Sequence, residues 1–233
     1  QGRQQQAFAF FGGRRLAIGV VQVHAAQADG GHCETGDGTR CYHGLNTLNQ
    51  QGTVIESTTA LEVRGLVTSF RTPRGRLRAV DGLSLRVPVG KTLCIAGESG
   101  CGKSVTALSV MGLLPETAHV DAGEILFNGR DLLKLPAAER RLLRGRELAM
   151  IFQEPMTALN PVLTVGQQVA EVYRVHGTAG AEEARQRALK MLEQVKIPDA
   201  ARRYNEYPHQ LSGGMKQRVM IAMALAQGPK LLI

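Results

Sequence analysis

One glycine-rich segment constrains the fold of this chain more than any other feature. It follows the pattern G-x-x-x-x-G-K-[ST] over residues 97–104. An apolar run, residues 92–96, precedes the pattern, and a helical run, residues 105–114, follows it. Loops of this kind cradle phosphate groups when they connect a strand to a helix. The segment therefore predicts a buried strand, a phosphate-binding loop and a helix whose N-terminus faces the anion.

Each part of this loop has its own expected role. Glycines let the backbone aim successive N–H groups at phosphates, Lys103 reaches the β- and γ-phosphates, and the Ser104 hydroxyl suits Mg²⁺. The alternative is a glycine-rich turn with a solvated lysine. The bare sequence pattern is expected to arise by chance about once per hundred chains. The predicted nucleotide-binding positions in the loop are Gly97, Glu98, Ser99, Gly100, Cys101, Gly102, Lys103, Ser104 and Val105.

Composition narrows the class of protein. The net charge is +8, but the basic residues are scattered, Trp is absent and only 4% of residues are aromatic. A stacking surface for single-stranded nucleic acid is therefore not expected. No apolar run approaches about 18 residues, so any membrane role should go through a partner. Cys94 and Cys101 lie in the predicted strand and loop, unsuited to pairing with each other, which indicates a reducing compartment.

The N-terminal part differs in kind from the rest. Residues 1–53 are rich in Gln, Gly and Ala and show no amphipathic period, so we expect a disordered or non-native extension before a domain spanning 54–233. Residues 8–28 have a faint signal-peptide shape, but their apolar part is too short. A zinc site is a further alternative, although its spacing matches no common ligand pattern. Its members would be His32, Cys33, Cys41 and His43.

The remaining pattern alternates between strands and helices, which predicts an α/β fold. We expect an antiparallel pair near 60–87, a strand with an Asn-Gly turn near 123–133, a strand at 147–152 and another from 230. Helices are expected at 136–146, 164–176, 181–195 and 211–227, with 198–208 irregular. In the helix at 181–195, Glu183 precedes Arg187 by one turn on the exposed side, and the expected buried residues are Ala184, Ala188, Met191, Leu192 and Val195.

Three further positions are candidates for nucleotide contacts. Phe70 ends a strand upstream of the loop, where it either stacks on a purine or simply fills the strand. Gln153 follows an apolar strand, where its amide could ligate Mg²⁺ or orient a water, and the alternative is a solvated loop residue. The sequence L-S-G-G-M-K-Q, residues 211–217, opens a helix with Ser212 as its cap, followed by Gly213 and Gly214. That helix N-terminus either binds an anion or is plainly capped.

Together these motifs resemble the nucleotide-binding domain of an ABC transporter ATPase. The resemblance covers about residues 59–233, and the segments G-E-S-G-C-G-K-S, F-Q-E-P-M-T-A-L-N-P and Y-P-H-Q-L-S-G-G-M-K-Q-R resemble most the oligopeptide/dipeptide (or nickel) importer branch. It implies a P-loop NTPase fold of the ABC type with an antiparallel β subdomain and a helical subdomain at about 154–215. The fold is expected to be incomplete at its C-terminus.

The resemblance also implies roles and partners. It assigns adenine stacking to Phe70, catalysis to Lys103 and Gln153, and Mg²⁺ to Ser104 and Gln153. Ser212, Gly213 and Gly214 would bind the γ-phosphate of an ATP held by a second ATP-binding subunit in a head-to-tail dimer. The implied cofactors are ATP and Mg²⁺. The other implied partners are membrane permease subunits and, indirectly, a solute-binding protein, with no nucleic acid, at the cytoplasmic face of the inner membrane.

One departure from the family pattern affects catalysis. The family expects an Asp and a catalytic Glu directly after the strand that begins at Lys230, then a later His, and the sequence stops before all three. We therefore expect the parent protein to hydrolyse ATP to drive import of peptides or a related solute, and the 233-residue chain to bind nucleotide without turnover. Two alternatives remain: a soluble ABC ATPase acting on nucleic acid or the ribosome, and a nucleotide-binding fragment without catalysis.

Overall fold

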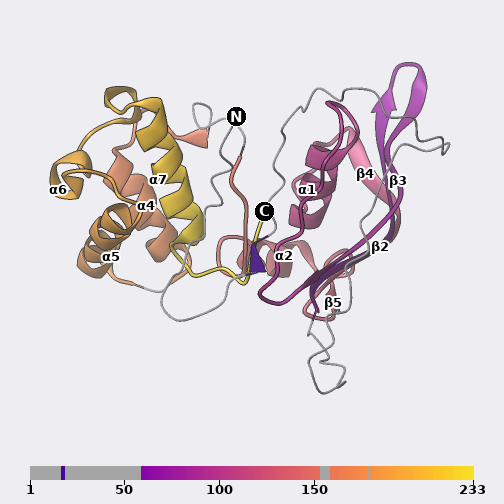
Figure 1. Cartoon of the computed structure of the whole chain (residues 1–233), viewed down its shortest axis with the longest axis horizontal. Helices are drawn as coiled ribbons and strands as arrows, with labels where there is room; N and C mark the ends of the chain where they lie inside the picture. Colours follow the sequence, from indigo (N-terminus) through magenta and orange to yellow (C-terminus); the bar gives the residue numbers. More distant parts are fainter. Residues whose placement is uncertain (1–16, 19–58, 153–157, 178) are drawn as a thin grey trace, which may run out of the picture.

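Two long strands organise the first half of the structure, a computed structural model that describes residues 17–18, 59–152, 158–177 and 179–233. Strands β2 (Thr59–Thr72) and β3 (Gly75–Pro88) form an antiparallel hairpin, and β4 (Ala118–Phe127) pairs with the other side of β2. The short β5 (Arg130–Asp131) follows a turn at Asn128 and Gly129, both with positive φ. The sheet order is β3-β2-β4-β5 (Figure 1). The Asn-Gly turn and the antiparallel pairing were both expected from the sequence.

Helix α1 (Lys103–Met111) covers one face of this sheet. Its buried side joins alternate residues of the strands in one apolar cluster, because residues two apart in a strand share a face. The Thr68 and Ser109 hydroxyl oxygens lie 3.1 Å apart inside this contact. The cluster comprises Leu61, Val63, Leu66, Val80, Val87, Val110, Met111, Ile125, Phe127, Leu132, Leu148 and Leu231.

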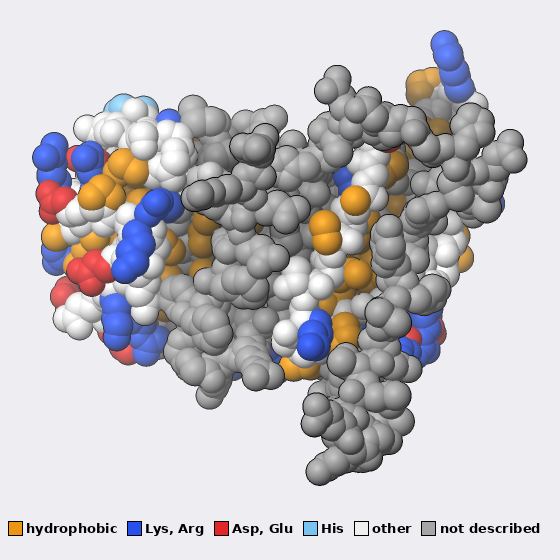
Figure 2. Space-filling view, in the orientation of Figure 1, with side chains coloured by type: hydrophobic (Ala, Val, Ile, Leu, Met, Phe, Trp, Pro, Cys, Tyr) orange, Lys and Arg blue, Asp and Glu red, His pale blue; other side chains and the backbone are white. Residues whose placement is uncertain are grey.

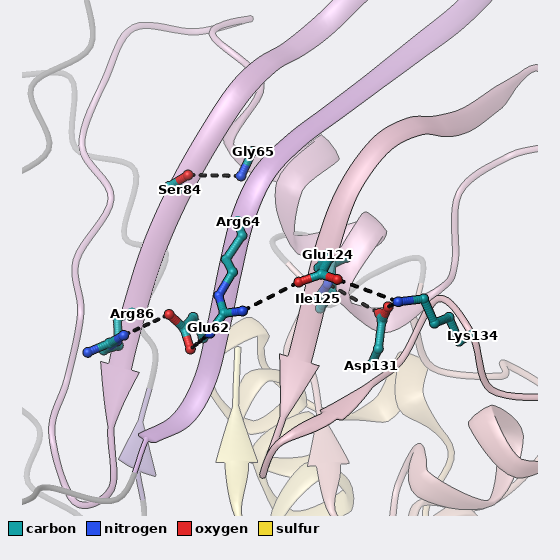
Figure 3. A network of polar contacts seen from close by, with 9 residues as sticks. All are labelled: Glu62, Arg64, Gly65, Ser84, Arg86, Glu124, Ile125, Asp131 and Lys134. Carbon is teal, nitrogen blue, oxygen red and sulfur yellow. Dashed lines mark hydrogen bonds and ion pairs between the residues drawn. The ribbon is translucent and has the colours of Figure 1, made fainter.

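An ion-pair network crosses the strands at a more exposed part of this sheet (Figure 3). Glu62 accepts hydrogen bonds from Arg64 at 3.0 Å and from Arg86 at 2.7 Å. These hydrogen bonds lower the pKa of the Glu62 carboxyl to about 2, and the bond from Arg64 contributes more than the bond from Arg86. Arg64 also reaches Glu124, which lies near Lys134. The network links three neighbouring strands by charge, although exposed pairs of this kind contribute little to stability.

Helices form the second half, shown at the left of Figure 1. They are α4 (Val165–Val175), α5 (Ala181–Gln194), the four-residue α6 (Ala200–Arg203), the 3₁₀ turn η1 (Pro208–Gln210) and α7 (Gly213–Leu225). Their shared apolar cluster includes Val165, Val169, Ala184, Ala188, Leu192, Val219 and Ala222, all of them fully buried. The expected Glu183–Arg187 pair is present one turn apart, with 2.5 Å between its atoms.

A small parallel sheet lies between the two halves. Its order is β1 (Ala17–Ile18), β7 (Leu231–Leu232) and β6 (Leu148–Ala149). In β6 and β7 the first residue belongs to the sheet cluster and the second to the helical cluster. Because successive strand side chains point to opposite faces, this sheet separates the two cores and contributes to both.

The structure corrects three sequence-based predictions. Residues 92–96 form no regular strand: a single bridge at Cys94 is their only sheet pairing in the described part of the chain, so Cys94 is exposed and the run is not buried. Helix α1 begins at Lys103 and ends before Gly112, whose φ of 62° closes the helix three residues ahead of Pro115. The segment 198–208, expected to be irregular, contains α6.

The predicted domain boundaries remain predictions. Apart from β1, the proposed extension 1–53 lies outside the described residues, and so does its candidate zinc set. Within the described part of the chain, no group of three or more His, Cys, Asp or Glu residues is arranged to hold a metal ion. Over the same residues, no helix has the length and apolar character needed to cross a bilayer.

Candidate functional site

The phosphate loop contains a tight turn whose backbone conformation depends on glycines. Gly100 and Gly102 have φ values of 87° and 90°, which residues with a side chain rarely adopt. Between them, Cys101 N–H donates to the Glu98 carbonyl at 3.4 Å. Gly102 also lies so close to β3 that a Cβ atom there would overlap the Ala79 carbonyl oxygen. The loop therefore needs glycine at Gly102 both for its dihedral angle and for its close approach to the sheet.

Lys103 lies folded inside this loop. Its side chain is only 7% exposed, and its Nζ donates to the carbonyl oxygens of Gly97 at 2.8 Å and Glu98 at 2.5 Å. The Cys101 Sγ atom lies 3.3 Å from the same nitrogen. A buried ammonium needs such acceptors, and a phosphate oxygen is a stronger acceptor than a carbonyl. The lysine is thus held where an anion entering the loop can take over its hydrogen bonds.

The N-terminus of α1 is open to an anion. Gly102 is its N-cap, no described side chain caps it, and its first turn carries no acidic residue. The first-turn N–H groups and the positive end of the helix dipole are therefore available. Ser104 is exposed at this end and Val105 is half-buried. The loop positions predicted from the sequence, residues 97–105, are thus brought together around one helix end.

Phe70 lies near this loop on the neighbouring hairpin. It follows Thr68 by two residues in β2, and Thr68 pairs with Val80, whose side chain lies beside Gly102. Because Thr68 contacts α1, Phe70 shares the face of β2 that α1 covers. Phe70 is half-buried between Leu77 of β3 and Ala118 of β4 in the register of the sheet. An aromatic ring therefore lies beyond the phosphate loop along the same sheet.

The second candidate anion site is at the start of α7. Ser212 is its N-cap and accepts a hydrogen bond from Met215 N–H at 3.4 Å, as the sequence predicts. Nothing lies within 4 Å of the positions that Cβ atoms would take on Gly213 and Gly214. Figure 1 places α7 in the half of the molecule opposite α1. The structure therefore does not bring Ser212 to the phosphate loop of its own chain, and Gln153 lies outside the described residues.

Some neighbours of the loop carry no sequence signal. Ala79 and Val80 contact Gly102, and the hydroxyl contact between Thr68 and Ser109 fixes α1 against β2. These residues belong to no motif, and only the three-dimensional pairing of β2, β3 and α1 brings them together. Sequence reasoning misses them for that reason.

Two glycine-to-alanine substitutions are expected to have opposite effects. Gly102→Ala should destabilise the protein by about 1–3 kcal/mol, because it combines a positive φ with a backbone overlap. Gly214→Ala should leave stability unchanged or raise it by about 0.5–1 kcal/mol, because the site is open and helical. Urea unfolding of the two variants measures both values, and equal losses would contradict the geometry described for the loop.

Comparison with known proteins agrees with this arrangement. A solved dimer of the ATP-binding cassette MJ0796, in a post-hydrolysis state bound to ADP and Pi, superposes with a TM-score of 0.66 at 28% identity over 74% of this chain and 72% of that one. A probable peptide ABC transporter ATP-binding protein of Sinorhizobium fredii is 53% identical over 174 residues, 74% of this chain and 52% of the relative. The oligopeptide transport ATP-binding protein OppD of Bacillus subtilis is 49% identical over 181 residues, 77% of this chain and 51% of the relative.

The fold is therefore that of an ATP-binding cassette, as the sequence predicts. The sequence model of the ABC transporter family matches residues 80–233, well over half of the chain, so this protein belongs to the ABC transporter family. The relatives that resemble it are named as ATP-binding proteins of peptide, dipeptide or oligopeptide transport. The chain spans about half the length of these curated relatives.

Proposed function

We propose that the chain is the nucleotide-binding part of a subunit that binds and hydrolyses ATP to energise an ABC importer of peptides or a related small solute. The main observation behind this proposal is the uncapped N-terminus of α1, together with the Lys103 ammonium that is held in the adjoining loop. This end offers N–H groups and an ammonium to the phosphates, and the first turn of α1 carries no carboxylate. The high identity to peptide-import ATP-binding proteins supports the class of solute.

The residues present fit ATP and Mg²⁺. Lys103 would exchange its carbonyl acceptors for β- and γ-phosphate oxygens, and the N–H groups of residues 97–105 would hold the α- and β-phosphates. Ser104, exposed at the helix end, would hold Mg²⁺ together with Gln153. Phe70 would stack on adenine from the neighbouring hairpin. ATP itself supplies the phosphoanhydride whose cleavage releases the free energy for transport.

The position of α7 supports a dimer. Ser212, Gly213 and Gly214 present an uncrowded helix end, yet they belong to the half of the molecule that lies opposite α1. We infer that this end binds the γ-phosphate of an ATP held by a second ATP-binding subunit, arranged head to tail. The same proposal places permease subunits against the region of Gln153, and the assembly at the cytoplasmic face of the inner membrane, with a solute-binding protein as an indirect partner.

A chimera tests the transport function. The 181 residues of this chain that match the Bacillus subtilis OppD replace their counterparts in that subunit, in a strain lacking its own copy. We expect the chimera to restore uptake of a labelled oligopeptide and the same chimera with Lys103→Ala to fail. A chimera that binds ATP and is stably expressed but imports no peptide would contradict the proposed solute class and leave nucleotide binding intact.

A further inference from the structure

An arginine cluster lies at the opposite end of α1 from the phosphate loop. Helix α2 (Ala137–Leu143) and the residues after it carry Arg140, Arg141, Arg144 and Arg146. Arg144 Nη1 donates to the carbonyl oxygen of Met111, the last residue of α1, at 3.2 Å. The cluster is thus anchored to α1 at its C-terminal end.

Two of these guanidinium groups converge on one point. A Cβ atom built on Gly112, the residue that ends α1, would lie 3.5 Å from Arg144 Nη1 and 3.6 Å from Arg140 Nη1. Gly112 has no Cβ, so both guanidinium groups can lie close beside this residue. A single phosphate group is wide enough to accept a hydrogen bond from both nitrogens.

Among the residues that the structure describes, no carboxylate pairs with these arginines. The nearest acidic residues along the chain are bound elsewhere, Glu139 to Arg130 at 2.8 Å and Glu147 to Lys230 at 2.7 Å. Within the described residues, none of the four arginines forms an ion pair, and the buried Nε of Arg140 has no hydrogen-bond partner. Burial is the main cause that lowers the pKa of the Arg144 guanidinium, and the positive charges of Arg140 and Arg141 lower it further. The cluster is therefore a local excess of positive charge.

Capping of α1 explains only part of this arrangement. Cations are favourable near the last carbonyl groups of a helix, and Arg144 makes that contact with Met111. The single guanidinium group of Arg144 is enough for this capping contact. Arg140 makes no such bond among the described residues, although its Nη1 is aimed at the same place and its Nε is buried. Capping of α1 therefore accounts for the position of Arg144 and not for that of Arg140.

We propose that Arg140 and Arg144 form a binding site for a phosphate group at the C-terminal end of α1, with Arg141 adding to its positive potential. Two sources share this chemistry: free phosphate and the headgroup of an anionic phospholipid. The side chain of Leu142, 65% exposed on the same short helix, is suited to contact with a lipid surface and has no role in binding free phosphate.

The first experiment measures binding of inorganic phosphate to the full chain by calorimetry, with a saturating non-hydrolysable ATP analogue present to occupy the phosphate loop, including its γ-phosphate position. We expect Arg140→Gln to weaken this binding roughly tenfold or more, as for loss of a charge-assisted hydrogen bond. Arg74→Gln removes the same charge from an exposed turn and should change nothing. Arg140→Lys keeps the charge and should restore part of the affinity. Because Arg144 supports α1, its Gln variant is used only if its thermal unfolding matches that of the unsubstituted chain.

The second experiment measures co-sedimentation with phosphatidylglycerol-containing vesicles and with phosphatidylcholine vesicles as a control. If the source is lipid, the chain sediments only with the anionic vesicles, Arg140→Gln weakens this by about fivefold, and Leu142→Gln weakens it further without affecting phosphate binding. Binding of either phosphate source that depends on Arg140 supports the site. Binding of neither, or binding that Arg74→Gln and Arg140→Gln weaken equally, would overturn it.

Discussion

Replacing Lys103 by alanine is expected to weaken Mg²⁺-ATP binding by about 10- to 150-fold, because a charge-assisted contact to phosphate contributes about 1.5–3 kcal/mol. The lysine is 7% exposed and its nitrogen already lies within the loop, so little reorganisation separates the observed position from the phosphate-bound one. Calorimetric titration with a non-hydrolysable ATP analogue measures the effect directly.

Lys91→Ala is the matched control for this substitution. Lys91 precedes the same loop, is exposed, and its removal makes the same change in net charge. The Lys91→Ala variant should bind the ATP analogue with the same affinity as the unsubstituted chain. Because Lys103 also bonds to Gly97 and Glu98, thermal unfolding is measured for both variants. Equal nucleotide affinity of a folded Lys103→Ala chain would show that the loop does not bind phosphate through this lysine.

Replacing Leu192 by alanine is expected to destabilise the protein by about 2–5 kcal/mol. Leu192 has no exposed surface and lies in the cluster that joins α4, α5 and α7. Truncation there removes buried methyl groups and leaves a cavity that surrounding helices fill only in part. Denaturant unfolding followed by circular dichroism gives the free energy difference.

Leu142→Ala provides the comparison for this change. Its side chain is 65% exposed, so we expect a change within about 0.5 kcal/mol. Helix α1, which follows the phosphate loop, packs in the other cluster, so the Leu192→Ala chain should keep its ATP affinity under conditions where it stays folded. A loss below 1 kcal/mol for Leu192→Ala would contradict the packing described for the helical half.

Local signals account for the parts of the structure that the sequence predicts well. The Asn-Gly turn at Asn128, the cap at Ser212 and the buried stripe of α5 each depend on residues within a few positions of one another. Such features form wherever their own residues favour them. The phosphate loop belongs to the same group, since its glycines and Lys103 are contiguous.

Features that depend on distant partners could not be predicted in this way. The apolar run at residues 92–96 has strand-like composition, but a strand also needs a neighbouring strand to pair with, and in the described structure this segment makes only a single bridge at Cys94. Gly166 packs so tightly on the Tyr204 ring that no side chain fits, a contact across 38 positions of sequence. The convergence of Arg140 and Arg144 beside Gly112 is equally non-local. No local sequence motif predicts these contacts, because each one joins residues that only the folded chain brings together.

Amide hydrogen exchange of the full chain with and without Mg²⁺-ATP shows directly whether residues 97–105 bind the nucleotide phosphates. We expect the N–H groups of this segment, including those of the uncapped first turn of α1, to exchange at least about tenfold more slowly when ATP is bound. Exchange in α5, which belongs to the helical cluster, should be unchanged. Unaltered exchange at residues 97–105 under saturating ATP, or protection confined to other segments, would contradict phosphate binding by this loop.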